Sequence, residues 1–196
     1  MASESVSWKA APANEAGQSL NRLSDKSLKH LLDSMTGDNI AGNDKAVCWT
    51  IGLKASEGSR ARKFLPANMF AAELAFWEEQ SLQFREHDAD RGSPAHILAL
   101  NNVKFWTELI ARTGPTKRVN FGVLSYHVML WSKQGRPPAG TTASHLCGNA
   151  ECVNPAHLVW EGMQLNATRN YCTYMAKNNE AFSLEVHCLH EPKCVV

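Results

Sequence analysis

Cysteine and histidine gather in the C-terminal part of this sequence at spacings that suit metal ligation. One group is Cys147, Cys152 and His157, with four residues between each side chain and the next. A second group comprises Cys172, Cys188, His190 and Cys194. Zinc favours four thiolate or imidazole ligands in a closed tetrahedral site. The first group lacks one ligand, and Cys48 is the one cysteine of the six left unassigned. Two structural zinc sites would therefore use every cysteine in the chain.

These side chains have other possible fates. An even number of cysteines could form disulfides in a secreted protein, but the N-terminal stretch MASESVSWKAAPANEAG is polar and lacks the apolar segment of a signal peptide. We therefore expect an intracellular protein with reduced cysteines. Cys48 could instead be a buried apolar thiol, and His187 competes with His190 as the imidazole ligand. Structural zinc is favoured because the residues after Cys172 include too little apolar material to fold otherwise.

Two further side chains beside the first cysteine group could carry chemistry. His145 ends an expected strand, two residues before Cys147, and an imidazole held beside an ordered loop suits a general base. Asn166 lies on the next expected helix, and its amide oxygen is a hard ligand that suits Mg²⁺. Together they indicate phosphodiester hydrolysis, in which His145 activates a water and Asn166 holds a cation at the phosphate. The alternative is that His145 merely caps a strand and Asn166 is an exposed helix residue.

Composition and charge narrow the class of protein. The 196 residues can bury one core, 44% of them are hydrophobic, and no apolar run is long enough to cross a bilayer. The net charge is +1. Residues 112–172 carry six Lys or Arg and two Asp or Glu, whereas residues 1–111 carry 12 Lys or Arg and 14 Asp or Glu. Phosphate binding depends on the local field, so this distribution permits DNA binding.

Apolar periodicity and turn residues predict a mixed α+β chain. The expected elements are an arm over 1–18, helices over 19–35, 66–90, 94–112 and 121–133, a strand over 46–54 that turns at Glu57-Gly58 into 59–65, strands over 141–147 and 158–161, and a helix over 162–172. The last three elements form a strand–loop–strand–helix unit that carries both His145 and Asn166.

Two segments strongly resemble the His-Cys box homing endonucleases. They are ASHLCGNAECVNPAHLVWEGMQLNATRNYC (143–172) and CLHEPKC (188–194), and a weaker likeness covers Cys48-Trp49 and GPTKR (114–118). This family belongs to the ββα-metal, or His-Me finger, nucleases and is related to the HNH enzymes. Its terminal C-x-H-x3-C spacing favours His190 over His187. The resemblance implies an α+β fold with a ββα-metal nuclease core, two structural zinc sites, an antiparallel DNA-reading hairpin and added helices.

The resemblance also implies roles for single residues. His145 would be the general base, and Asn166 the sole protein ligand of a catalytic Mg²⁺. One structural zinc would be held by Cys48, Cys147, Cys152 and His157, and the other by Cys172, Cys188, His190 and Cys194. A family arginine that supports the scissile phosphate falls at Arg118 or Lys117, of which we favour Arg118. Asn154 matches an asparagine that braces the base.

The implied activity is Mg²⁺-dependent, site-specific cleavage of double-stranded DNA, of the intron-homing type and located in the nucleus. The family reads the major groove with an antiparallel sheet, and the expected counterpart is the hairpin 49–63. Its candidate DNA contacts, together with one downstream residue, are Lys54, Arg60, Arg62, Lys63 and Lys117. A solvated charged hairpin is the alternative for these side chains. The alternative for the whole chain is a catalytically inactive, zinc-stabilised DNA-binding module.

Domain organisation and assembly complete the expectations. Residues 1–45 would form an N-terminal arm and helix, and residues 46–196 the zinc-stapled nuclease domain with a helical insertion at 64–112. A homodimer is expected, as in the family. Dimerisation by exchange of C-terminal tails is not, because the chain stops two residues after Cys194. The insertion could supply a different interface or enlarge the core, through Phe70, Phe76, Trp77, Phe105 and Trp106.

Overall fold

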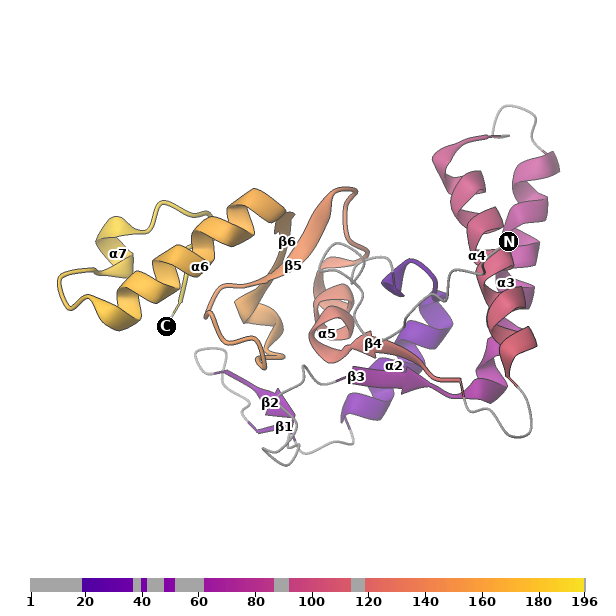
Figure 1. Cartoon of the computed structure of the whole chain (residues 1–196), viewed down its shortest axis with the longest axis horizontal. Helices are drawn as coiled ribbons and strands as arrows, with labels where there is room; N and C mark the ends of the chain where they lie inside the picture. The colour runs from indigo at the N-terminus through magenta and orange to yellow at the C-terminus, as the bar shows by residue number, and fades with distance from the viewer. Residues whose placement is uncertain are drawn as a thin grey trace, which may run out of the picture. The chain divides into compact units, whose positions relative to one another are not determined.

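The computed structural model describes residues 19–36, 40–41, 48–51, 62–86, 92–113 and 119–195 (Figure 1). The helices and strands are α2 (Asp25–Thr36), β1 (Ile40–Ala41), β2 (Thr50–Ile51), β3 (Arg62–Leu65), η1 (Ala67–Met69), α3 (Phe70–Glu86), α4 (Pro94–Arg112), β4 (Phe121–Leu124), α5 (Ser125–Gln134), β5 (Thr141–His145), η3 (Pro155–His157), β6 (Leu158–Gly162), α6 (Met163–Asn178) and α7 (Leu184–His187). The chain divides into two compact units. Unit 1 comprises Met1–Asn21, Leu32–Lys63 and Val123–Val196, and unit 2 comprises Arg22–Leu31 and Phe64–Gly122.

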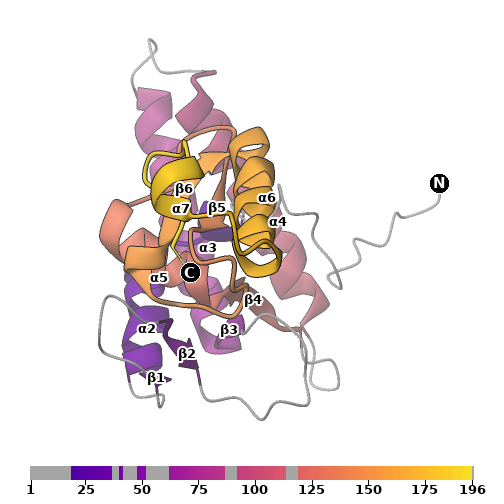
Figure 2. The same cartoon turned by 90° about the vertical axis from the view of Figure 1, so that its left-hand side faces the viewer.

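The centre of unit 1 is the β5–β6 hairpin, with α6 packed against both strands (Figure 2). The strands are antiparallel, with Thr141 opposite Gly162 and His145 opposite Leu158. The predicted order of strand, loop, strand and helix is confirmed. The last helix runs to Asn178 rather than 172, because no Gly or Pro interrupts the chain between Met163 and Asn178.

A glycine lets the loop after β5 lie directly on α6. Gly148 has a φ of +61°, and a Cβ at this position would lie 2.8 Å from the side chain of Thr173. Both the left-handed backbone and the close approach require glycine. The loop that carries Cys147 is therefore pressed onto the helix that carries Asn166.

The expected helix over 121–133 is wrong at its start, because residues 121–124 form strand β4 and α5 begins at Ser125. Phe121 and Val123 are buried, and β4 pairs with β3 in a two-stranded sheet. Gly122 permits this packing, since a Cβ there would lie 2.7 Å from the ring of Phe64. A short strand with long-range pairing leaves little periodic signal in the sequence.

The expected hairpin pairing of 46–54 with 59–65 is also wrong where the structure describes these residues. Strand β2 pairs with β1, placing Ile51 opposite Ile40, and β3 pairs with β4. Sequence proximity favours a local hairpin, but pairing with the distant β4 places Leu65 in the core. The turn at Glu57-Gly58 lies outside the described residues, as do Lys54 and Arg60.

Unit 2 is built on the pair of helices α3 and α4, which lie side by side (Figure 1). Helix α4 has the expected bounds, because Ser93 accepts a hydrogen bond from the backbone N–H of His96 and Pro94 occupies the first turn. Helix α3 begins four residues later than expected, after the 3-10 turn η1. Phe70, Trp77 and Trp106 are buried, so the insertion has an aromatic core of its own.

The turn before α2 is held by groups from both helices of the insertion. The indole N–H groups of Trp77 and Trp106 each donate to the carbonyl of Arg22, at 2.9 Å. The buried carboxylate of Glu73 accepts from the backbone N–H of Ser24 at 2.8 Å and from its hydroxyl at 2.5 Å. Ser24 in turn caps the helix, because its Oγ accepts from Ser27 N. Residues 19–20 are helical, residues 21–24 form the turn, and α2 begins at Asp25, so the predicted helix over 19–35 is interrupted at this cap.

Two broader expectations concern membrane-spanning segments and the domain boundary. Among the described residues, no helix combines the length and the apolar character that crossing a bilayer requires. The expected domain boundary between residues 45 and 46 stays a prediction.

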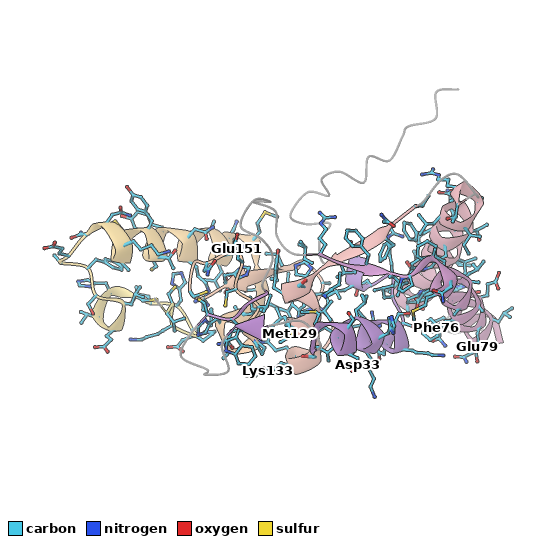
Figure 3. All side chains as sticks on the ribbon, turned by 90° about the horizontal axis from the view of Figure 1, so that it is seen from below. Asp33, Phe76, Glu79, Met129, Lys133 and Glu151 are labelled. Carbon is cyan, nitrogen blue, oxygen red and sulfur yellow. The ribbon has the colours of Figure 1, made fainter. Side chains whose placement is uncertain are left out.

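Replacing Glu73 with Gln should destabilise the protein. The change puts an amide N–H where a carboxylate oxygen accepts, and leaves a buried donor of Ser24 without its charged partner. We expect the free energy of unfolding to fall by about 2 kcal/mol, measured by urea denaturation. The matched control is Glu79→Gln on the exposed side of the same helix (Figure 3). Equal stability of the two variants would show that the buried carboxylate does not hold the turn.

Candidate functional site

Among the described residues, two groups of Cys and His side chains could each hold a metal ion. Metal site 1 comprises Cys48, Cys147, Cys152 and His157, whose ligand atoms all lie within 4.8 Å of one another. The Nδ1 of His157 lies 3.7 Å from the Sγ of Cys48 and 3.6 Å from the Sγ of Cys152. Sulfur and nitrogen ligands of a tetrahedral zinc, bound at about 2.3 and 2.0 Å, lie roughly 3.5 Å apart. The donor set therefore fits zinc, and Cys48 joins it as expected.

Local backbone contacts bring the four ligands of metal site 1 together. Cys147 and Cys152 lie on the loop after β5, and His157 ends η3. The amide oxygen of the fully buried Asn154 accepts from the N–H of Ala156 and caps η3, which orients His157. The N–H of Val153 donates to the carbonyl of Trp49 at 2.8 Å, which holds the neighbouring Cys48 against the loop.

Metal site 2 comprises Cys172, Cys188, His190 and Cys194. The Nδ1 of His190 lies 3.5 Å from the Sγ of Cys172, 3.3 Å from that of Cys188 and 3.5 Å from that of Cys194. These distances match the spacing of ligands around a tetrahedral zinc. The other candidate, His187, is exposed and its ring contacts Ser183. The structure therefore groups His190, and not His187, with the three cysteines.

A hydrogen bond sets the tautomer of His190. The hydroxyl of Thr168 donates to the carbonyl of Leu165 at 2.8 Å, so its oxygen can accept from His190 Nε2, 2.9 Å away. With the proton on Nε2, Nδ1 presents a lone pair toward the three thiols. Metal-ligating histidines are commonly oriented by such an outer hydrogen bond.

All six cysteines lie among the described residues and none forms a disulfide. In metal site 1 a hydrogen bond from Cys147 lowers the pKa of Cys152 to about 5, and the same contact raises the pKa of Cys147. In metal site 2 burial opposes ionisation of Cys188, but the N–H groups of Cys194 and His190 lower its pKa to about 6. Burial raises the pKa of Cys194 to about 12. In each cluster the surrounding protein favours ionisation of one cysteine. Ionisation of all three cysteines requires a cation between their sulfur atoms.

The ring of His145 is oriented by two groups. Its Nε2 lies 3.1 Å from the carbonyl oxygen of Cys152, and the ring of Tyr126 meets it edge-on with centroids 4.6 Å apart. A carbonyl only accepts, so Nε2 carries the proton and Nδ1 carries the lone pair. Because the Sγ of Cys152 belongs to metal site 1, the same residue contributes to the cluster and to the orientation of the imidazole.

Asn166 is half-buried in the first turn of α6 and lies against β5. Its Oδ1 accepts a hydrogen bond from the hydroxyl of Ser144 at 2.9 Å. Ser144 is buried and immediately precedes His145. A carbonyl oxygen has two lone pairs, so one remains for a cation. The structure thus holds Asn166 at the same end of β5 as His145.

A residue whose position the sequence analysis did not foresee lies one turn beyond Asn166. Arg169 had counted only as part of the basic bias, yet its side chain is fully buried. Its Nε lies 2.8 and 2.7 Å from the two carboxylate oxygens of Glu161, and its Nη1 lies 2.6 Å from the carbonyl of Pro192 and 3.7 Å from the Sγ of Cys194. Its position three residues before Cys172, on one helical face, was the available signal.

The expected DNA contacts are described only in part. On β3, Arg62 is exposed and Lys63 is half-buried. Lys54, Arg60, Lys117 and Arg118 lie outside the described residues, so the choice between Lys117 and Arg118 as phosphate support stays a prediction.

One comparison with known proteins finds a match in the C-terminal part of the chain. Residues 102–196 match the family model described as the zinc-binding loop region of homing endonuclease. The matched segment includes α5, the β5–β6 hairpin, α6 and seven of the eight candidate zinc ligands, with Cys48 upstream of it. No solved structure matches the chain.

Elemental analysis of the purified chain should find two zinc ions per molecule. Cys172→Ser should remove one ion by disrupting metal site 2, and Cys147→Ser should remove one by disrupting metal site 1, because each group supplies its own four ligands. Thermal unfolding should begin at a lower temperature in both variants, since structural zinc contributes directly to folding. A well-folded wild-type preparation that contains no zinc would refute the ligand assignment.

Proposed function

We propose that this chain, whose residues 102–196 belong to the family of zinc-binding loop regions of homing endonucleases, is a Mg²⁺-dependent endonuclease that cuts double-stranded DNA at specific sites. One observation carries the proposal. An imidazole with a fixed tautomer and a hydrogen-bonded carboxamide lie at the same end of β5, on a hairpin-and-helix unit joined to two metal sites. This arrangement suits hydrolysis of a phosphodiester by a base-activated water.

His145 is the proposed general base. Its Nε2–H donates to the Cys152 carbonyl, so Nδ1 is the nitrogen that takes a proton from the attacking water. Tyr126 packs edge-on against the ring and limits its rotation. A base acts efficiently when neighbouring groups hold its orientation before the substrate arrives.

Asn166 is the proposed protein ligand of the catalytic cation. The hydroxyl of Ser144 occupies one lone pair of its Oδ1 and fixes the direction of the other. A single neutral oxygen suits Mg²⁺, which keeps several waters and binds substrate phosphates. When bound, this ion supplies charge stabilisation for the phosphate and the leaving oxygen.

Basic side chains support the choice of DNA as substrate. Apart from the buried pair of Arg169 and Glu161, residues 112–172 contain five Lys or Arg and one Asp or Glu. The proposed DNA contacts are Lys54, Arg60, Arg62, Lys63 and Lys117, with Arg118 as the support of the scissile phosphate. The proposal extends to intron homing in the nucleus and to a homodimer.

The activity test uses a pool of double-stranded DNA fragments with and without Mg²⁺. The wild type should cut in a Mg²⁺-dependent manner, and His145→Ala and Asn166→Ala should each lower the cleavage rate about 10²- to 10⁴-fold, as expected for loss of a general base or of the cation ligand. The matched control is His187→Ala, which removes an exposed histidine outside both metal sites and should leave the rate unchanged. Retention of DNA without any cutting by the wild type would favour an inactive DNA-binding module.

A separate measurement tests the contacts proposed on β3. The double substitution of Arg62 and Lys63 with Ala should weaken DNA binding similarly for all sequences if both side chains contact phosphates. The slope of log affinity against log salt should then fall by about 0.9 for each lost contact. Lys29→Ala, an exposed lysine on α2, is the control. An unchanged slope in the double variant would remove β3 from the proposed interface.

A further inference from the structure

Arg169 is a buried cation between Glu161 and metal site 2, which would be anionic with zinc bound. A zinc ion with three thiolates and one imidazole carries a net charge of −1, and Glu161 carries another negative charge 8 residues before Arg169. The side chain of Arg169 has no exposed surface. Burying a guanidinium is strongly unfavourable unless charged and hydrogen-bonding partners surround it. Metal site 2 and Glu161 together provide such partners.

The partners of Arg169 come from separate segments of unit 1. Glu161 lies on β6 and accepts from Nε through both carboxylate oxygens, at 2.8 and 2.7 Å. Pro192 and Cys194 lie in the C-terminal segment and are contacted by Nη1. The Nη2 atom has no hydrogen-bond partner among the described residues. A single planar group therefore joins α6 to the hairpin on one side and to metal site 2 on the other.

The position of Arg169 along α6 connects this junction to the catalytic end. Asn166 precedes it by three residues and Cys172 follows it by three, so the three side chains lie on neighbouring positions of the helix surface. Cys172 anchors the helix to metal site 2, and Asn166 meets Ser144 of β5. Rotation or translation of α6 would break the contacts of Arg169 and displace Asn166 together.

We infer that Arg169, oriented by Glu161, is a positioning residue that holds α6 against metal site 2 and thereby keeps Asn166 in place. The inference rests on the proposed function of Asn166 as the cation ligand. Arg169 itself reaches neither the cation nor the DNA. It fixes the helix on which Asn166 stands and donates to the Sγ of Cys194, a candidate zinc ligand. A lysine at this position keeps the charge but cannot contact Glu161, Pro192 and Cys194 at once.

The experiment compares Arg169→Lys and Glu161→Gln with Arg136→Lys. Arg136 is a matched control, because its Nη1 also donates to a backbone carbonyl in unit 1, that of Leu20 at 3.0 Å, and it is not a member of either metal site. The first readout is zinc release to a chromogenic chelator, which needs no activity. In both test variants one of the two zinc ions should leave about 10- to 100-fold faster, the usual effect of losing an outer partner of a metal ligand.

The second readout is the Mg²⁺ concentration that gives half-maximal cleavage. It should rise about tenfold in the test variants, while the rate at saturating Mg²⁺ changes less, because Asn166 is displaced rather than removed. Faster zinc release with an unchanged Mg²⁺ requirement would overturn the inference and leave Arg169 as a partner of metal site 2 alone. Unchanged values in both readouts would also overturn it.

A third readout separates this inference from the proposed function. Hydrogen exchange of the backbone amides of residues 163–168 should be faster in Arg169→Lys than in Arg136→Lys, whether or not the wild type cuts DNA. An inactive wild type with this exchange difference would refute the proposed function but retain the coupling. Equal exchange in the two variants would refute the coupling. If Arg169→Lys does not fold, Glu161→Gln supplies the same comparison.

Discussion

The gathering of cysteine and histidine side chains into two clusters that could each hold a zinc ion is the constraint on which the arrangement of the C-terminal part of this protein depends. Each cluster gathers four donors from separate segments, and in each cluster one cysteine, Cys152 or Cys188, has a lowered pKa. A divalent cation at these positions replaces mutual repulsion between thiolates with attraction to a common centre. The loop after β5 and the segment after α6 thus acquire a fixed shape without a large hydrophobic core.

A few contacts connect the two clusters to the candidate catalytic side chains and hold those side chains in place. Cys152 contributes its sulfur to metal site 1 and its carbonyl to His145, so the imidazole is oriented by the backbone of a ligand. Thr168 orients His190 from the same helix that carries Asn166. The chemistry proposed for this site therefore depends on side chains that belong to the metal-bound loops as much as to the hairpin. Unit 2 has a separate aromatic core and a buried carboxylate, and needs no metal to explain its packing.

The sequence predicted the local parts of this structure well and the long-range parts poorly. Ligand spacing identified seven of the eight clustered side chains, and Cys48 was added because it was the one cysteine left unassigned. Pro94 with Ser93 marked the start of α4. Such signals can be read without knowing how distant segments pack. Strand β4 and the partners of β2 and β3 were missed, since short strands are fixed by distant pairing. The burial of Arg169 was equally invisible, because a buried arginine and an exposed one look identical until Glu161 and Cys194 are placed around it.

The two clusters differ in how much chain they span. Metal site 2 draws its ligands from a short stretch between Cys172 and Cys194, whereas Cys48 and His157 of metal site 1 are 109 residues apart. Closing a longer loop carries a larger entropic penalty, which grows only slowly with its length. During synthesis, Cys48 can join metal site 1 only after the helical insertion and the β5–β6 loop have been translated. Assembly of the imidazole-bearing end is thereby tied to synthesis of the chain as far as His157, whereas metal site 2 can close within one short segment.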